Sequence, residues 1–575
     1  MVYIGGKAMK KFHLTDEYVL MNFDSSEIDS KVSIINSWHF QNVLRQFYTR
    51  LQKEDHEILK QLGYPTTQEL LGFYRLLITH NFDQASQIDP NLIKFRTKRR
   101  PLLHFTNMFY DHWRALNRFG MMRSSMAHPQ SAKYPEMIAA TEVFSENIIA
   151  LYRTITETIL GRPHTVYRKL PAGTNASLLY ATYRLNLEEG YENLYRIPLI
   201  TTVATQPPFI VYTKSNIREG VFEEIDHNPI NYLSIDNTHY YIFPLLVGDL
   251  LAFCYIHRDL LHQGIGLTNL FEIASPDYCK NAKPDLIFLY GIREDEFDCK
   301  FHHDKENDVY IGFVSRAAKN DYFGYLKKMV LTLHNVAMIN RGNLPVHGAM
   351  VRIDLNNNKR RNVVIIGDSG AGKSETLEAL RVIGKDYIKS MEVVFDDMGV
   401  FSINNKVVSG SGTEIGAFVR LDDLDAGYAY EEFDRAIFMN PDQTNARLIM
   451  PLSSYEFIST KHPIHLVLYA NNYEDKEGLR LFDNVDEALD VFKAGRRRAK
   501  GTTAEKGLVE SYFANPFGPL QRKEQTEVLL ENYFNLLDQR GVLLGELYTK
   551  LALPGFETSG PQRASEILLQ YLLEQ

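Results

Sequence analysis

The segment from Asn362 to Ser374 constrains this chain more than any other part of the sequence. An apolar run, Val363 to Ile366, leads into the turn Gly367-Asp368-Ser369-Gly370-Ala371-Gly372-Lys373-Ser374, and good helix formers follow from Glu375 to Leu380. This order predicts a buried strand, a glycine-rich turn and the start of a helix. The backbone N–H groups of such a turn surround phosphate oxygens, and the positive end of the helix dipole strengthens the attraction.

The turn has the form GxxxxGK[ST], which predicts the binding of a nucleoside triphosphate. Lys373 is then expected to reach the β- and γ-phosphates, and the Ser374 hydroxyl to ligate Mg²⁺. An ordinary glycine-rich turn between a strand and a helix is the alternative interpretation. The residues expected to contact the nucleotide here are Gly367, Asp368, Ser369, Gly370, Ala371, Gly372, Lys373, Ser374 and Glu375.

Composition limits the other possibilities. The chain has 575 residues, of which 45% are apolar and 23% charged, as expected for a globular protein with two to four domains. A net charge of −8 gives no electrostatic footprint for nucleic acid, and no segment approaches the roughly 18 apolar residues of a membrane span. Three cysteines without CxxC spacing and an N-terminus without the apolar run of a signal peptide predict a cytoplasmic protein.

Hydrophobic periodicity predicts an α/β protein in three parts. Residues 1–164 have apolar residues at helical spacing and are expected to form a helical N-terminal domain. Short runs rich in aromatic and β-branched residues, separated by Asn, Gly and Pro, predict a small mixed α/β or α+β domain over 165–280. Residues 281–575 contain the glycine-rich turn and are expected to form the nucleotide-binding catalytic domain, a mixed sheet with helices.

Candidate metal-binding and catalytic residues flank the turn. Downstream, Val393 to Phe395 reads as a buried strand that ends in Asp396 and Asp397, the pattern of a carboxylate pair that holds a nucleotide-bound metal. A helix N-cap after a strand is the alternative. Upstream lie Lys327 and Lys328, and His347 follows Lys328 by 19 residues. Taken singly, the lysines fit a solvated helix face and His347 a core histidine.

Together these residues resemble the ATP-dependent phosphoenolpyruvate carboxykinases and their relatives, the HPr kinase/phosphorylases. The carboxykinase pattern has Tyr-x-Gly before two lysines, a histidine at the same spacing of 19, a phosphate loop and an Asp-Asp strand, and this chain has Tyr322 and Gly324 in the first two places. Further similar segments follow in order at Glu414-Ile415, at Asn445-Ala446-Arg447 and from Gly501 to Gly518. The resemblance covers roughly residues 310–570.

The resemblance implies a carboxykinase-like phosphate-loop domain with two divalent cations. Lys328, His347 and Asp397 are expected to hold Mn²⁺, which requires a neutral lysine, and Ser374 is expected to hold the Mg²⁺ of ATP, with GTP as an open possibility. Glu414 is expected near the ribose. The catalytic residues that the resemblance implies are Lys327, Lys328, His347, Lys373, Asp396 and Arg447, of which Lys373 and Arg447 clamp the transferring phosphoryl group.

This sequence departs from the carboxykinase pattern where the substrate is expected. Tyr325-Leu326 replaces Glu-Met, and Gly348-Ala349-Met350 replaces the Cys-Ser-Ala that follows the histidine. Carboxykinases hold the substrate carboxylate with the arginine of an Arg-Ser-Pro segment, for which Arg123, in a region expected to be helical, is the candidate. The loop from Gly367 to Thr376 is closer to the HPr kinases, whereas the tail from 500 to 570 resembles the carboxykinases.

Three functions therefore stay open. The first is a carboxykinase-type enzyme, which decarboxylates oxaloacetate and phosphorylates the resulting enolate from ATP, giving phosphoenolpyruvate, ADP and CO₂. The second is an HPr-kinase-type enzyme acting on a serine of an acceptor protein or on a small hydroxyl compound. The third is a nucleotide-gated regulator whose N-terminal half senses a ligand. The sequence predicts neither a nucleic-acid nor a membrane partner, and it does not give the oligomeric state.

Overall fold

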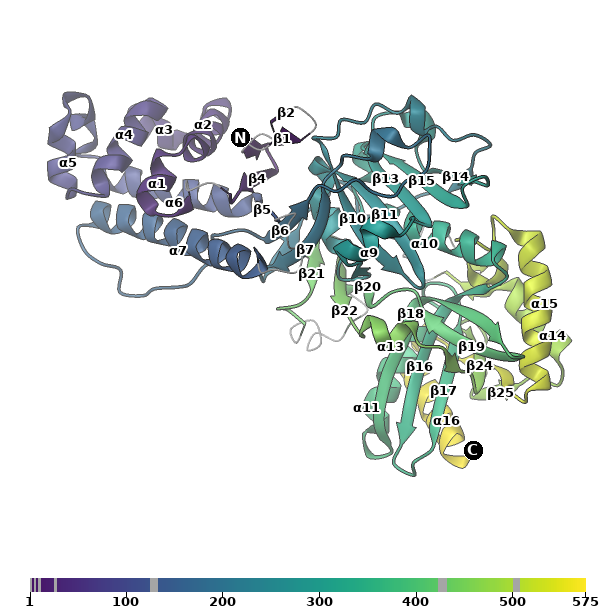
Figure 1. Cartoon of the computed structure of the whole chain (residues 1–575). Coiled ribbons are helices and arrows are strands. Elements are labelled where there is room, and N and C mark those ends of the chain that lie inside the picture. The colour runs from purple at the N-terminus through teal and green to yellow at the C-terminus, as the bar shows by residue number, and fades with distance from the viewer. Residues whose placement is uncertain are drawn as a thin grey trace. The chain divides into compact units, whose positions relative to one another are not determined.

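The computed structural model describes residues 3–4, 7–8, 12–24, 28–124, 133–421, 424, 432–499 and 507–575. The chain divides into two compact units: Met1–Tyr183 with Pro198–Phe209, and Arg184–Ile197 with Ile210–Gln575 (Figure 1). The sequence predicted a third part over 165–280, whereas most of that range shares a unit with the phosphate loop. The mixed α/β character that the sequence predicted is confirmed in both units.

The first unit combines a helical layer with a small mixed sheet. Apolar residues at helical spacing, from Val43 on α2 to Ile159 on α7, bury a common core between the helices. The strands run in the order β3-β4-β5-β6-β7, with β5 parallel to both of its neighbours. The expected helical domain therefore also contains strands. The helices are α1 (Lys31–Asn36), α2 (Trp38–Lys53), α3 (Glu57–Leu62), α4 (Thr67–Leu77), α5 (Phe82–Ile88), α6 (Arg99–Ala115) and α7 (Lys133–Leu160), and the strands β3 (Phe12–Leu14), β4 (Tyr18–Asn22), β5 (Asn117–Arg123), β6 (Ala176–Ala181) and β7 (Leu199–Thr205).

One sheet of the second unit precedes the phosphate loop in the chain. Its strands follow the order β10-β11-β13-β15-β14-β9, and β11, β13 and β15 are parallel. Strand β11 is buried along its whole length, which explains its continuous apolar sequence. The elements of this sheet and its helices are β9 (Glu223–Glu224), β10 (Tyr240–Val247), β11 (Leu250–His257), β12 (Glu272–Ile273), β13 (Leu286–Ile292), β14 (Lys300–Asp304), β15 (Val309–Ser315), α8 (Leu261–Leu267), α9 (Pro276–Asn281) and α10 (Phe323–Asn340).

A second sheet carries the phosphate loop between two helical layers. Its strand order is β23-β19-β18-β16-β17-β24-β28-β25, with parallel pairs only at β17-β24 and β24-β28. Helices α11 and α16 pack on one face, and α14 and α15 pack on the other. The elements are β16 (Leu344–Leu355), β17 (Arg360–Ile366), β18 (Ile388–Asn404), β19 (Val407–Gly412), β23 (His462–Pro463), β24 (Leu466–Asn471), β25 (Leu479–Leu481), β28 (Leu543–Tyr548), α11 (Lys373–Ile383), α14 (Val485–Ala494), α15 (Lys523–Gln539) and α16 (Ser559–Glu574).

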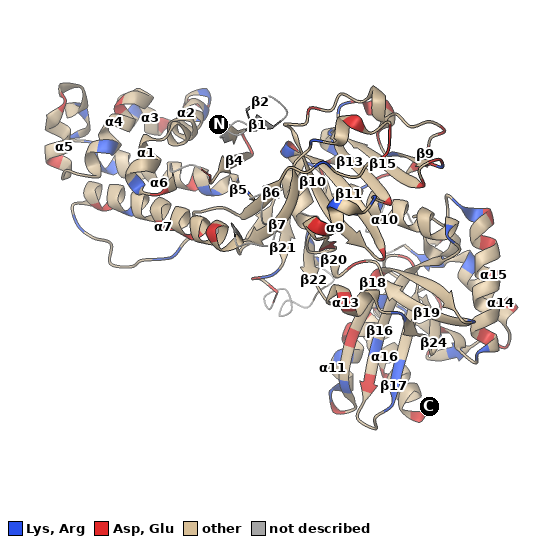
Figure 2. Ribbon diagram, viewed as in Figure 1, with Lys and Arg blue, Asp and Glu red and all other residues tan. Residues whose placement is uncertain are grey.

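Smaller elements complete the second unit. Strand β22 (Arg447–Pro451) pairs with both β20 (Gly416–Arg420) and β21 (Ile437–Met439), and β26 (Arg496–Arg498) pairs with β27 (Leu508–Glu510). Figure 2 shows charged residues mainly on helices and loops, whereas the central strands β10 and β11 carry none. Among the helices in the described ranges, none has both the length and the apolar character needed to cross a membrane.

Candidate functional site

The phosphate loop joins a buried strand to a helix, as the sequence predicted. Strand β17 is buried at Val363 to Ile366, and helix α11 begins at Lys373. Gly372 has φ +93°, and a Cβ atom built there would lie 2.7 Å from the Cβ of Thr549. Only glycine meets both requirements without strain, since it lacks a Cβ and tolerates positive φ. The consensus glycine thus fixes the backbone of the turn.

A buried ion pair sets the shape of this loop. The Nε of Arg497 lies 2.8 Å from Oδ2 of Asp368, and Arg497 is 5% exposed. Burial acts to raise the pKa of Asp368, but His347 and Arg497 outweigh it and lower the pKa, so the carboxylate stays charged. The Nζ of Lys373 donates to the carbonyl oxygens of Gly367 (2.6 Å) and Asp368 (3.0 Å), inside the turn where phosphate oxygens are expected.

Asp396 lies beside the Mg²⁺-binding serine that the sequence predicted. The Ser374 hydroxyl donates to Oδ1 of Asp396 at 3.0 Å. Burial raises the pKa of Asp396, against the opposing effect of Lys373. The prediction that the strand ends at the two aspartates was wrong, because β18 continues to Asn404. The apolar residues that follow, among them Val400 and Phe401, extend the pairing with β16 and keep both aspartates inside the sheet.

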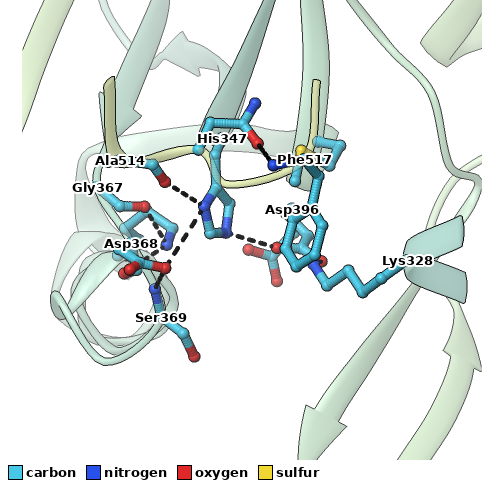
Figure 3. Close-up of polar contacts among 12 residues, drawn as sticks. Lys328, His347, Gly367, Asp368, Ser369, Asp396, Ala514 and Phe517 are labelled. Carbon is cyan, nitrogen blue, oxygen red and sulfur yellow. Dashed lines mark hydrogen bonds and ion pairs between the residues drawn. The ribbon is translucent and has the colours of Figure 1, made fainter. Parts of the chain in front are cut away.

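Lys328 and His347 converge on Asp397. Figure 3 shows the side chains of Lys328 and His347 with the neighbouring Asp396. The Nζ of Lys328 lies 2.7 Å from Oδ2 of Asp397, and the Nε2 of His347 lies 2.8 Å from Oδ1. The lysine comes from α10, the histidine from β16 and the aspartate from β18, where Gly348 pairs with Asp397. Of the three residues that the sequence predicted as metal ligands, Lys328 and His347 are therefore each within contact distance of Asp397.

The hydrogen bonds of His347 fit a cation between the imidazole and Asp397. Its Nδ1 lies 2.6 Å from the carbonyl oxygen of Ala514, which can only accept, so Nδ1 carries the proton. Burial and Lys373 lower the pKa of His347, which leaves a neutral ring with a lone pair on Nε2 facing a carboxylate. Two acceptors at this distance need a cation or a proton between them. Backbone acceptance of the second ring N–H is also the usual arrangement of metal-binding histidines.

The two neighbouring lysines have different electrostatic environments. Lys327 is 1% exposed and lies 2.7 Å from Asp397 and 2.9 Å from Glu414. Burial acts to lower its pKa, but these two carboxylates outweigh burial and raise it. For Lys328, burial and the charge of Lys327 lower the pKa despite Asp397. Lys328 is thus the lysine better able to become neutral and bind a metal, and Lys327 a permanent counter-ion.

Glu414, expected near a ribose, is buried as the partner of Lys327. Its side chain is 1% exposed, and burial raises its pKa to about 7. A contact with a ribose would need the side chain to leave this ion pair. The structure therefore supports a role for Glu414 in placing Lys327.

Backbone strain accumulates at this site. Asp397 has φ +131° in the middle of β18, and Ala514, whose carbonyl faces His347, has φ +50°. Asn445, two residues before Arg447, has φ +63°. Non-glycine residues at positive φ cost about 1–3 kcal/mol each and gather at functional sites. Surrounding packing therefore holds these three residues in conformations that their sequence disfavours.

Two arginines, Arg447 and Arg218, lie against the same aromatic rings as Lys327 and Lys328. The guanidinium of Arg447 lies 5.2 Å from the centre of the Phe418 ring, which Lys327 also faces, and its buried Nε has no hydrogen-bond partner among the described residues. Arg218 lies 5.0 Å from the centre of the Phe517 ring, and Lys328 lies 4.8 Å from the same ring. Burial lowers the pKa of Arg218, and its guanidinium donates a hydrogen bond to the Gly220 carbonyl.

Sequence reasoning missed Arg218 and Arg497. Arg218 stands in a polar stretch without a motif, so no local signal identified it. Arg497 belongs to a run of three arginines that composition alone describes as basic. The candidate that was named, Arg123, ends strand β5 of the first unit and is not in a helix, contrary to the prediction. Ser125, two residues after Arg123, and the segment 500–506 of the carboxykinase-like tract lie outside the described residues.

The candidate metal site depends on its lysine. Within the described ranges, no group of three or more His, Cys, Asp or Glu side chains is placed to hold a metal ion. The centre consists instead of one histidine, one aspartate and Lys328, with Ser374 and Asp396 beside the phosphate loop.

The chain was also compared with known proteins. No model of a known protein family matches it, and no curated protein sequence does either. Any functional assignment must therefore come from the residues and the geometry described above.

Proposed function

We propose that this protein is a nucleotide- and divalent-metal-dependent enzyme of the phosphoenolpyruvate carboxykinase type, converting oxaloacetate and ATP to phosphoenolpyruvate, ADP and CO₂. The observation that carries the proposal is the approach of Lys328 and His347 to Asp397, one residue from the Asp396 that binds Ser374 of the phosphate loop. An ordinary nucleotide-binding domain needs only the second of these two clusters.

The phosphate loop holds the triphosphate in this proposal. On nucleotide binding, Lys373 exchanges its carbonyl partners for the β- and γ-phosphates, while Ser374 and Asp396 hold the Mg²⁺ of the nucleotide. Arg447, whose buried Nε has no hydrogen-bond partner among the described residues, supplies a second positive charge for the phosphate that is transferred. We therefore propose that these residues position the phosphoryl group between two fixed charges.

A second divalent cation, which the resemblance to the carboxykinases implies to be Mn²⁺, would be held by Lys328, the Nε2 of His347 and Asp397. When bound, such a cation stabilises negative charge that develops on a substrate oxygen. Lys327 keeps Asp397 ionised, and the Ala514 carbonyl keeps the proton of His347 on Nδ1. These two contacts orient the donor atoms before substrate arrives.

Arg218 supports an anionic substrate at this centre. It shares the Phe517 ring with Lys328 and forms no ion pair with a carboxylate within the described ranges. A guanidinium binds a carboxylate through two parallel hydrogen bonds, which orients the substrate as well as attracting it. Arg218 therefore takes the role for which the sequence offered Arg123.

A second candidate is a kinase of the HPr-kinase type. Asp396 favours it, because a buried carboxylate with a raised pKa beside the phosphate loop suits a general base for an incoming hydroxyl group. The replacement of Glu-Met by Tyr325-Leu326 points the same way. The acceptor is then a protein serine or a small alcohol.

An activity assay tests the proposal. The purified full-length protein is incubated with Mn²⁺, Mg²⁺, oxaloacetate and either ATP or GTP, and phosphoenolpyruvate is measured with Lys373→Ala as the inactive control. We expect product from the wild type, and a rate at least roughly a hundredfold lower in Lys373→Ala, since removing one transition-state donor has this effect.

The other outcomes are equally informative. If the wild type makes no more product than Lys373→Ala, the carboxykinase proposal is wrong. Transfer of phosphate from ATP to a serine-bearing protein or an alcohol would then favour the kinase. Nucleotide binding without any turnover would instead indicate a nucleotide-gated regulator.

A further inference from the structure

A polar cavity of about 400 Å³ lies in the second unit, at one end of the sheet β10-β11-β13-β15. Its wall includes His257 at the end of β11, Arg293 just after β13 and Arg316 just after β15. These three strands are parallel neighbours, so the cavity lies at their carboxyl ends. Ligands of parallel α/β sheets bind preferentially at this edge. The volume falls within the range of small-molecule sites.

A bulge shapes the floor of the cavity. The pairing of β13 with β15 shifts register between Tyr290 and Ile292, and Gly291 between them has φ +94°. A Cβ atom at Gly291 would lie 2.6 Å from the Cβ of His257. The hydroxyl of Tyr240 donates to the Gly291 carbonyl at 2.9 Å, which ties β10 to the bulge. Bulges of this kind redirect side chains next to binding sites. The cavity is therefore preformed by backbone geometry.

The charge of the cavity is positive. Arg293 and Arg316 are exposed at its wall, and in the described part of the chain neither guanidinium forms an ion pair. One carboxylate, Asp236, also lines the cavity and accepts from the backbone N–H of Thr238, so the two guanidinium groups leave a net positive charge. Glu294 accepts from the backbone N–H groups of Ser234 and Arg293. Burial lowers the pKa of His257 to about 4, so this ring is neutral near pH 7 and the arginines carry the charge.

We propose that this cavity binds a phosphorylated small molecule, whose phosphate is held between Arg293 and Arg316 and whose remainder lies against His239, His257 and Tyr240. Two guanidinium groups at one opening suit a phosphate better than a single positive charge does, because each offers paired N–H donors. None of the lining residues belongs to the phosphate loop or to the Lys328–His347–Asp397 centre. The ligand is thus additional to the nucleotide and the substrate.

The segments that leave the cavity lead toward the candidate catalytic lysines. The chain after His257 forms α8, and the chain after Arg316 leads to Asp321 and then to α10. The two segments meet where His262 (3.1 Å) and Gln263 (2.8 Å) bind Oδ1 of buried Asp321. Helix α10 carries Lys327 and Lys328 in its second turn. A ligand that orders both segments is placed to adjust the position of these lysines.

Chemical modification tests the proposal with inorganic phosphate as the probe. The full-length protein carries Lys373→Ala, which weakens phosphate binding at the phosphate loop, and is treated with phenylglyoxal with and without phosphate. Mass spectrometry then gives the rate at each arginine. At phosphate ten times its dissociation constant from equilibrium dialysis, modification of Arg293 and Arg316 should slow roughly tenfold. Exposed Arg162, which lines neither this cavity nor the phosphate loop, should react at an unchanged rate.

Phosphate binding by a double variant is the second test of the proposal. Arg293→Gln with Arg316→Gln, in the same Lys373→Ala protein, should bind phosphate at least roughly tenfold more weakly, whereas Arg162→Gln should bind it normally. Circular dichroism and the melting temperature without phosphate check that each variant is folded. Equal modification rates with and without phosphate, or unchanged binding by the double variant, would overturn the proposal. Neither readout uses phosphoenolpyruvate formation, so the result is independent of the proposed enzyme activity.

Discussion

At the residue scale, the site assigns different tasks to two adjacent lysines. Lys327 is enclosed by Asp397 and Glu414, and its pKa is raised. Lys328 is 17% exposed, contacts Asp397 from the open side and has a lowered pKa. The family resemblance implied a catalytic role for both residues and metal binding for Lys328 alone. Their surroundings separate a structural counter-ion from a candidate metal ligand.

Substitution by methionine should separate the two lysines. Lys327→Met leaves buried Glu414 without its cation and leaves Asp397 with Lys328 as its remaining lysine, so we expect the free energy of unfolding to fall by about 3–5 kcal/mol. Lys328→Met should destabilise much less but weaken Mn²⁺ binding at least roughly tenfold. Denaturant titration measures the first quantity, and electron paramagnetic resonance of free Mn²⁺ measures the second. Equal effects of both variants on both quantities would contradict this division.

At the element scale, the turn between β17 and α11 depends on close backbone approach as well as on positive φ. Gly372 and Gly342 both have positive φ, but only Gly372 is crowded, by Thr549. Gly342→Ala is therefore the matched control. It should cost about 1–2 kcal/mol of stability from the left-handed backbone alone. Gly372→Ala should cost more and should weaken binding of a fluorescent ATP analogue at least roughly tenfold. Similar losses in both variants would mean that crowding at Thr549 is unimportant.

Helix α10 makes the stability of the fold depend on pH through His334, which is fully buried. Burial lowers its pKa to about 4, with Asp249, Lys461 and Asp285 as the charges that act on it. The unfolded chain therefore binds a proton near pH 6.5 that the folded protein does not accept until about pH 4. Its contribution to stability is complete above pH 6.5 and is lost as the pH falls through this window.

Between pH 7 and pH 5 this residue alone should lower the free energy of unfolding by about 2 kcal/mol. Replacement by glutamine removes the titration, so the stability of His334→Gln should depend less on pH by that amount, whatever its stability at pH 7. Denaturant midpoints at the two pH values measure the difference. Parallel pH profiles for wild type and variant would show that His334 is not responsible.

At the scale of the whole molecule, the candidate catalytic residues all belong to the second unit. ATP with Mg²⁺ should therefore protect that unit selectively. At one hundred times its dissociation constant, the stabilisation is about 2.7 kcal/mol. Hydrogen exchange followed by mass spectrometry should show slower exchange around residues 367–376 and 393–398, and little change from 28 to 124. Lys373→Ala is the control that should show no protection. Equal protection of residues 28–124 would contradict a site confined to the second unit.

The sequence by itself determined the parts whose cause is local. Apolar periodicity predicted helices in the N-terminal region and the strand and helix on either side of the phosphate loop, and the turn from Gly367 to Ser374 followed from its glycines and its neighbours. The family resemblance implied a common site for Lys328, His347 and Asp397, and the fold brings Lys328 and His347 into contact with Asp397. The sequence did not reveal the strands inside the first unit, or the continuation of β18 beyond Asp397.

Only the tertiary structure decided which side chains share an environment. Arg497 meets Asp368 across 129 positions of sequence, and Arg218 meets Lys328 through Phe517. Neither encounter leaves a local pattern, because it depends on how separate strands and loops pack. The same holds for charge: Lys327 and Lys328 are chemically identical and adjacent, and only burial and neighbouring carboxylates give them opposite pKa shifts. Local sequence thus specifies the donor groups, and packing fixes their protonation and partners.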